Sequence, residues 1–167
     1  MTGLIGIQIA ESSNHLCVNV EHMQPAKILI IDDNEADILL LRNALDQQGE
    51  DYELEILIDG EEALRFVRES RTGIREPHPC VILLDLHLPR YDGMAVLRAI
   101  REAPALEHIQ VLILSGLATP QQEIEIASLG AVYRRKSSSL DDLLELAAEI
   151  IAICKSFSLK TMPSSPK

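Results

Sequence analysis

The stretch Lys27-Ile-Leu-Ile-Ile-Asp-Asp-Asn34 decides the fold class of this chain. The four residues after Lys27 are aliphatic and mostly β-branched, without alternation, which predicts a short strand buried on both faces of a parallel sheet. The segment that follows, 35–48, carries Ile38, Leu41 and Leu45 at helical spacing. The folded part of the chain therefore begins with a buried strand, two acids and a helix.

The same alternation of strand and helix continues along the chain. Further strands are predicted at 52–58, 80–84, 109–114 and 131–135, and further helices at 61–68, 92–103, 119–130 and from 139 to about 155. The segment Thr119-Pro-Gln-Gln122 has the N-cap, first-turn proline and glutamine of a strong helix start. Five strands that alternate with five helices predict an α/β fold, a doubly wound parallel sheet with right-handed crossovers.

The length of 167 residues favours one folded domain, which we place at 27–155. Residues 1–26 contain no lysine or arginine and show no sustained periodicity, so we interpret them as an N-terminal extension. This extension is either a flexible arm or, if Met23 is the true translation start, largely a gene-calling artefact, and the intact mass of the native protein decides between the two. Residues 156–167 are predicted to be a disordered tail.

Charge and cysteine content narrow the class of protein. The chain has 15 basic and 26 acidic residues, a net charge of −11, and no visible basic patch of the kind that binds duplex DNA. Cys17, Cys80 and Cys154 have neither CxxC nor metal-ligand spacing, so we interpret them as reduced thiols. No secretory signal precedes Lys27, and the apolar stretch 4–10 is too short to span a membrane, so we expect a cytoplasmic protein without a membrane partner.

Polar residues stand where the predicted strands end, which is where function gathers in such sheets. They are Asp32, Asp33, Asp85, Ser115 with the following glycine, and Lys136. Taken singly, each has a plain structural explanation, because an aspartate at a strand end often caps the next helix and a lysine is often a solvated charge. Together, carboxylates crowded at one rim repel each other unless a cation neutralises them.

The chain from 27 to about 155 resembles the receiver domains of bacterial response regulators. The matching segments are IIDDN at 30–34, LLDLHLPRYDG at 83–93, LSG at 114–116 and GAVYRRK at 130–136. The resemblance implies a flavodoxin-like sheet with the strand order 2-1-3-4-5. It also implies a signalling protein, not an enzyme, that accepts phosphate from a phosphohistidine on a sensor histidine kinase or a phosphotransfer protein.

The resemblance further implies a role for each residue at the rim. Asp85 is the phosphoacceptor, since a carboxylate can act as a nucleophile and form an acyl phosphate. Asp32, Asp33 and Asp85, together with the backbone carbonyl of His87, hold Mg²⁺, which prefers oxygen ligands.

Three residues implied by the resemblance act around the phosphoryl group. Lys136 pairs with Asp85 before phosphorylation and with the phosphoryl oxygens afterwards. Ser115 is the switch hydroxyl that bonds to the new phosphoryl group. Tyr133 is the switch aromatic, which changes rotamer when Ser115 moves and so biases a two-state surface.

Two positions near the rim depart from the family pattern or stay open. Ser137 follows Lys136 where the family usually has proline, often after a cis peptide bond. A cis bond before a residue other than proline costs about 3–4 kcal/mol, so we expect a trans bond here, which leaves the position of the Lys136 ammonium open. The side chain of His87 either affects dephosphorylation or simply faces solvent.

Two further segments bear on partners. Arg134 lies where an apolar residue is typical, and its stem is expected to snorkel along the sheet edge. Arg134 and Arg135 then form either a solvated pair or part of a partner or dimer surface. The long segment 68–79 resembles that of stand-alone receivers that partner bacterial phytochrome-type kinases.

Three functions compete for this pattern. The first is a phosphorylated switch or phosphorelay shuttle, whose output is a partner surface or a homodimer through the face around Tyr133. The second is a phosphatase with an aspartyl nucleophile, which would need an acid two residues after Asp85, where His87 stands. The third is a pseudo-receiver, a binding module that is never phosphorylated; Ser137 keeps this alternative open.

Overall fold

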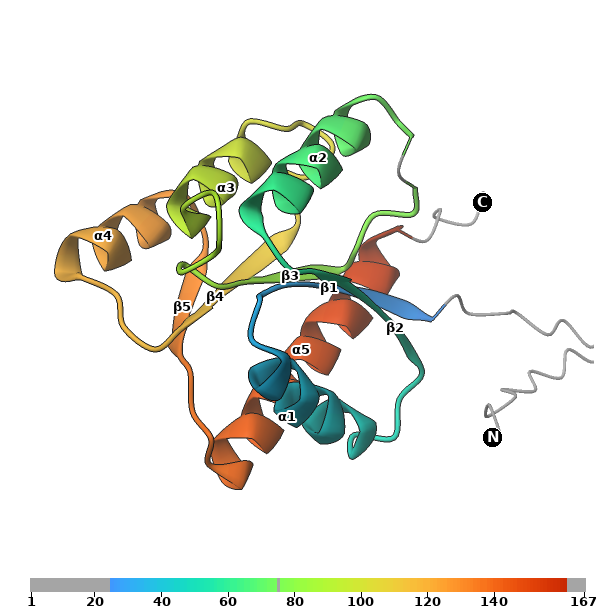
Figure 1. Ribbon diagram of the computed structural model, residues 1–167. Helices are drawn as coiled ribbons and strands as arrows, with labels where there is room; N and C mark the ends of the chain where they lie inside the picture. The colour runs from blue at the N-terminus through green and yellow to red at the C-terminus, as the bar shows by residue number, and fades with distance from the viewer. Residues whose placement is uncertain (1–24, 75, 162–167) are drawn as a thin grey trace, which may run out of the picture.

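The computed structural model describes residues 25–74 and 76–161, which form a five-stranded parallel sheet between two layers of helices (Figure 1). The strands are β1 (Ala26–Ile31), β2 (Tyr52–Leu57), β3 (Val81–Leu84), β4 (Gln110–Ser115) and β5 (Val132–Arg135). The helices are α1 (Glu35–Asp46), α2 (Gly60–Arg71), α3 (Gly93–Arg101), α4 (Pro120–Ser128) and α5 (Leu140–Thr161). The strand order β2-β1-β3-β4-β5 confirms the predicted fold.

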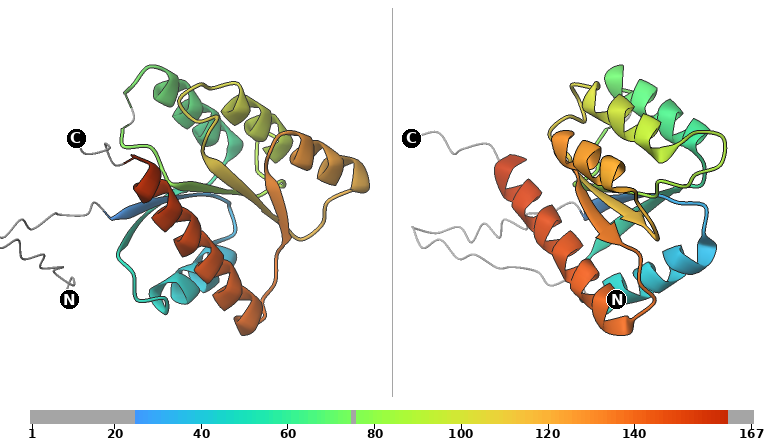
Figure 2. Two further views of the ribbon diagram at one scale, coloured as in Figure 1. Left: turned by 180° about the vertical axis from the view of Figure 1, so that it is seen from behind. Right: turned by 90° about the vertical axis from the view of Figure 1, so that its left-hand side faces the viewer.

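Two hydrophobic cores hold the helices against the two faces of the sheet. Helices α1 and α5 cover one face, and α2, α3 and α4 cover the other (Figure 2). Phe66, Met94 and Leu97 are buried in the core under α2 and α3. Leu45 and Ile150 are buried in the core under α1 and α5. Burial on both faces explains why the central strands have no polar alternation.

The register of the central strands places the acidic residues side by side. Ile31 at the end of β1 pairs with Leu84 at the end of β3. Each of the two is followed by an aspartate, Asp32 and Asp85. The backbone N–H of Asp85 donates to the carbonyl oxygen of Ile31 at 2.9 Å. The parallel pairing therefore delivers Asp32 and Asp85 to the same rim.

Helix α5 is longer than the sequence predicted. It continues past Lys155 to Thr161, where we expected a disordered tail from residue 156. The physical reason is Phe157, which is partly buried against both cores and stacks on His108 with ring centroids 6.0 Å apart. The predicted N-terminal extension up to residue 24, including the Met23 hypothesis, lies outside the described residues.

The interpretation of all three cysteines as reduced thiols is wrong for two of them. Cys80 and Cys154 form a disulfide, with Cα atoms 5.0 Å apart and a separation of 74 positions in the sequence. Both belong to the core under α1 and α5, where Cys80 directly precedes β3 and Cys154 lies in α5. Sequence spacing could not reveal this pair, because packing of the helix on the sheet brings the two residues together. Cys17 lies outside the described residues.

Helix ends follow the predicted signals at α4. The side chain of Thr119 accepts from the backbone N–H of Gln122 at 3.2 Å, and the Gln122 side chain accepts from the Thr119 N–H at 2.9 Å. This is the predicted capping box.

In the described parts of the chain, no helix combines the length and apolar character needed to cross a bilayer.

Candidate functional site

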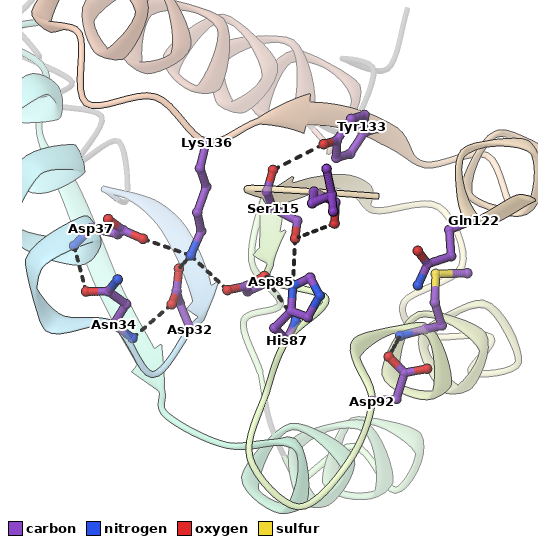
Figure 3. Close-up of polar contacts among 12 residues, drawn as sticks. Asp32, Asn34, Asp37, Asp85, His87, Asp92, Ser115, Gln122, Tyr133 and Lys136 are labelled. Carbon is purple, nitrogen blue, oxygen red and sulfur yellow. Dashed lines mark hydrogen bonds and ion pairs between the residues drawn. The ribbon is translucent and has the colours of Figure 1, made fainter. Parts of the chain in front are cut away.

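The predicted polar residues meet at the carboxyl ends of the strands (Figure 3). Asp32 and Asp33 follow β1, Asp85 follows β3, Ser115 ends β4 and Lys136 follows β5. Asp32 and Asp85 are only 5% and 7% exposed, although both are carboxylates. Burial of this kind is tolerated only where opposite charge or hydrogen bonds compensate.

The Lys136 ammonium provides that compensation. Its Nζ lies 2.7 Å from Asp32 Oδ2, 2.8 Å from Asp85 Oδ2 and 2.9 Å from Asp37 Oδ2. The backbone N–H of Lys136 donates to the Ser115 carbonyl at 3.0 Å, which anchors the lysine beside β4. Burial alone would lower the pKa of Lys136, but the bonds to the three carboxylates raise it above its ordinary value.

The peptide bond between Lys136 and Ser137 is trans, as the sequence predicted. The lysine still reaches Asp85 and Asp32. The absence of proline after Lys136 therefore does not remove the ammonium from the site.

Asp37 is the one lysine partner that the sequence analysis missed. It lies in the first turn of α1, where the side chain of the N-cap residue Asn34 accepts from the backbone N–H of Asp37 at 3.3 Å. Acids are common in the first turn of helices, so the sequence did not distinguish Asp37 from Glu35. The signal that could have found it was its place one helical turn after the acidic pair.

The two buried carboxylates differ in their pKa shifts. For Asp32, burial is the largest cause and raises the pKa, although Lys136 and the Asn34 N–H act in the opposite direction. For Asp85, burial also acts to raise the pKa, but the Lys136 ammonium and the His87 backbone N–H outweigh it, so its pKa lies below the ordinary value. The lowered pKa keeps Asp85 ionised, as a nucleophile or a metal ligand must be.

Asp32, Asp33 and Asp85 form an acidic triad that fits a divalent cation. One carboxylate oxygen of each lies within 4.8 Å of the others, so a single ion can contact all three. The donor set consists only of oxygens, which suits Mg²⁺ and related hard cations. Asp33 is exposed and borders an open hollow lined by the loop 86–92, so an ion can reach it from solvent. The predicted contribution of the His87 carbonyl stays a prediction.

Ser115 joins the loop after Asp85 to Tyr133. Its hydroxyl is buried, lies 3.0 Å from His87 Nδ1 and donates weakly to the Leu117 carbonyl at 3.4 Å. The hydroxyl of Tyr133 donates to the Ser115 carbonyl at 3.2 Å. The His87 side chain is 68% exposed, yet it does not simply face solvent, because its ring nitrogen contacts Ser115.

The Arg134 side chain stays 46% exposed, and its guanidinium forms an ion pair with Glu149 of α5. Its Nη2 lies 2.8 Å from Glu149 Oε1, and its Nε donates to Glu149 Oε2 at 3.1 Å. This bidentate ion pair links β5 to α5. Within the described residues, the arginine is therefore used inside the chain.

Gly93 closes the loop that carries Asp85, and it has no room for a side chain. Its N–H donates to the Leu86 carbonyl at 3.0 Å, and an added Cβ would lie 2.6 Å from Leu86 Cα and even closer to the Asp85 carbonyl. We expect Gly93→Ala to lower the free energy of unfolding by about 2–3 kcal/mol, because backbone atoms must move.

Urea unfolding followed by circular dichroism measures this loss. Gly116→Ala is the matched control, since an added Cβ there meets nothing within 4 Å, and it should stay within about 1 kcal/mol of wild type. Equal unfolding midpoints for the two variants would contradict the steric argument.

Comparison with known proteins gives consistent matches. Residues 28–148 match the family described as the response regulator receiver domain. The response regulator Rcp1 of Synechocystis sp. (strain ATCC 27184 / PCC 6803 / Kazusa) is 35% identical over 143 residues, which cover 85% of this chain and 95% of that protein.

Two solved structures of response regulators are also similar to this chain. The phosphorylated cyanobacterial phytochrome response regulator RcpA superposes with a TM-score of 0.68 at 31% identity, covering 86% of this chain and all of that chain. The Mn²⁺-bound form of Rcp1 superposes with a TM-score of 0.66 at 34% identity, covering 85% of this chain and all of that one.

Proposed function

Since this chain belongs to the family of response regulator receiver domains, whose members are signalling proteins and not metabolic enzymes, we propose that it is a single-domain phosphorylation switch. Asp85 accepts a phosphoryl group from a phosphohistidine. The observation that carries the proposal is the acidic triad, whose oxygens lie within 4.8 Å of one another, beside the Lys136 ammonium 2.8 Å from Asp85.

The transfer itself needs little from the protein beyond position and charge. A carboxylate oxygen of Asp85 attacks phosphorus, the bond from phosphorus to the donor imidazole nitrogen breaks, and its electron pair returns to that nitrogen. Asp32, Asp33, Asp85 and the His87 carbonyl would hold Mg²⁺, which when bound neutralises charge on the phosphoryl oxygens.

Lys136 and Ser115 then hold the product. Lys136 exchanges its bond to the Asp85 carboxylate for a bond to a phosphoryl oxygen, so the charge that the transfer adds is met by an ammonium already in place. The Ser115 hydroxyl donates to another phosphoryl oxygen. To do so, the Ser115 hydroxyl turns away from the Leu117 carbonyl. The movement of Ser115 is passed to Tyr133, because the Tyr133 hydroxyl donates to the Ser115 carbonyl.

The output in this proposal is a surface, not a reaction. The face around Tyr133 is recognised by a protein partner, forms a homodimer or passes the phosphoryl group on as a relay shuttle. The phosphoryl source is a sensor histidine kinase or a phosphotransfer protein, and DNA is not a direct partner. The name of the similar RcpA, a phytochrome response regulator, and the long segment 68–79 favour a phytochrome-type kinase as the donor.

The proposed location is the cytoplasm, where such donors meet their receivers. The disulfide between Cys80 and Cys154 is unusual for a reducing compartment. Both residues are buried, so soluble reductants reach the sulfur atoms slowly.

The competing functions have less support. The pseudo-receiver alternative rested on Ser137. The peptide bond between Lys136 and Ser137 is trans, yet the Lys136 ammonium still contacts Asp85. The phosphatase alternative needs an acid at the position of His87, whose ring instead contacts Ser115.

A small phosphodonor tests the proposal. The full chain is incubated with acetyl phosphate and Mg²⁺, and its intact mass is measured. We expect a gain in mass of one phosphoryl group. When a chelator removes the metal before incubation, no gain is expected. A pseudo-receiver would gain nothing under either condition, and a phosphatase would release phosphate from added esters with turnover.

A further inference from the structure

The strongest unexplained feature of the site is the third carboxylate on Lys136. An ammonium has three N–H groups, and here all three face carboxylates: Asp32, Asp85 and Asp37. The first two belong to the acidic triad. Asp37 does not, so the proposed metal and phosphoryl chemistry leaves it without a role.

We propose that Asp37 is a positioning residue that holds Lys136 in place when a divalent ion occupies the acidic triad. This inference rests on the proposed function. Asp37 lies 2.9 Å from Lys136 Nζ and is 36% exposed, against 7% and 9% for the side chains of Asp32 and Asp85. It is therefore the lysine's most hydrated partner and the one whose charge no ion would share.

Electrostatics gives Asp37 this role. An ion in the triad neutralises Asp32 and Asp85, which weakens their attraction for Lys136, and the ion also repels the ammonium directly. Asp37 keeps its full negative charge because it lies outside the triad. It therefore offsets the repulsion between the ammonium and the ion.

The local structure fixes Asp37 for this purpose. Asn34 caps α1 and accepts from the backbone N–H groups of Ala36 and Asp37, while the Asn34 N–H donates to Asp32 Oδ1 at 2.9 Å. One short segment thus orients both a triad acid and the outer acid.

The plain alternative is that Asp37 only stabilises the N-terminus of α1, as any first-turn acid does. Glu35 offers the matched control, since it lies in the same first turn and carries the same charge, but is not among the acids that contact Lys136. Asp37→Asn and Glu35→Gln each remove one charge from this turn.

A double-mutant cycle with Lys136 separates the two explanations. Mn²⁺ affinity is titrated for the full chain by water-proton relaxation in wild type, Asp37→Asn, Glu35→Gln and Lys136→Gln, and in each α1 variant combined with Lys136→Gln. We expect Asp37→Asn to weaken Mn²⁺ binding on the order of three- to fivefold, more than Glu35→Gln does. In the Lys136→Gln background the two α1 substitutions should have equal effects.

Two further readouts make the outcome decisive. Asp37→Glu keeps the carboxylate and should restore most of the Mn²⁺ affinity. At saturating Mg²⁺, phosphorylation by acetyl phosphate should be slower in Asp37→Asn than in Glu35→Gln. Equal effects of Asp37→Asn and Glu35→Gln on Mn²⁺ binding, or an Asp37→Asn effect that persists without Lys136, would overturn the inference.

These outcomes are distinct from failure of the proposed function. If wild type binds Mn²⁺ but is never phosphorylated, the proposed function fails and the cycle still decides the role of Asp37. If wild type does not bind Mn²⁺, both proposals are wrong.

Discussion

Replacement of Asp85 by asparagine is expected to abolish phosphoryl incorporation from acetyl phosphate. The amide has no anionic oxygen to attack phosphorus, so the acyl phosphate cannot form. The fold should persist, because Lys136 keeps Asp32 and Asp37 as partners and an amide is easier to bury than a carboxylate. Intact mass after incubation with Mg²⁺ and acetyl phosphate measures the loss.

The control for this variant is Asp92→Asn. Asp92 lies in the loop after Asp85, is exposed and caps α3 by accepting from the Met94 N–H at 3.3 Å. Asparagine caps helices as well as aspartate does, so this variant should be phosphorylated like wild type. Incorporation into Asp85→Asn would show that another residue accepts the phosphoryl group.

Replacement of Lys136 by glutamine should separate the two activities of the site. Phosphorylation by acetyl phosphate should slow on the order of 10²–10³-fold, because a preorganised donor to the developing charge is lost. Mn²⁺ affinity should rise on the order of tenfold, since the ammonium no longer repels the ion. A merely misfolded site would lose both properties together.

In the Lys136→Gln variant, the free energy of unfolding should depend on pH differently from wild type. In wild type the Asp85 pKa lies below its ordinary value, so its ionisation contributes stability above the unfolded-state pKa of about 3.9, lost as pH falls through the folded-state pKa. Without Lys136 the buried acids should have raised pKa values. They then destabilise the protein at neutral pH, by about 3 kcal/mol, and less as pH falls towards 4.

Urea unfolding at pH 7 and pH 5 checks this sign. Mn²⁺ should restore most of the stability that Lys136→Gln loses at pH 7, since the ion replaces the missing charge. Lys155→Gln is the control, because Lys155 pairs only with the exposed Glu50 among the described residues. A pH-independent loss in Lys136→Gln would contradict the electrostatic account.

The sequence predicted the strands and the rim because those features depend on local patterns. The aliphatic run before Asp32 and its counterpart before Asp85 are each recognisable alone, and parallel register then brings the acids together. Lys136 could be predicted for the same reason, since it follows the last strand.

The features that escaped prediction depend on contacts between distant elements. The Cys80–Cys154 disulfide and the extension of α5 past Lys155 both depend on how α5 packs against the sheet and its neighbours. In the sequence, Asp37 is indistinguishable from an ordinary first-turn acid. Only the folded chain shows that Lys136, which follows β5, contacts it. Such contacts leave no periodic signal in the sequence.

The central claim is that one divalent ion sits among the acids at the rim and touches the residue that is phosphorylated. Crystals of the full chain grown with Mn²⁺, measured at the manganese absorption edge, test it directly. We predict a single strong anomalous peak within bonding distance of carboxylate oxygens from both Asp33 and Asp85. A fully loaded crystal whose manganese lies elsewhere, or touches Asp33 without Asp85, would contradict the account.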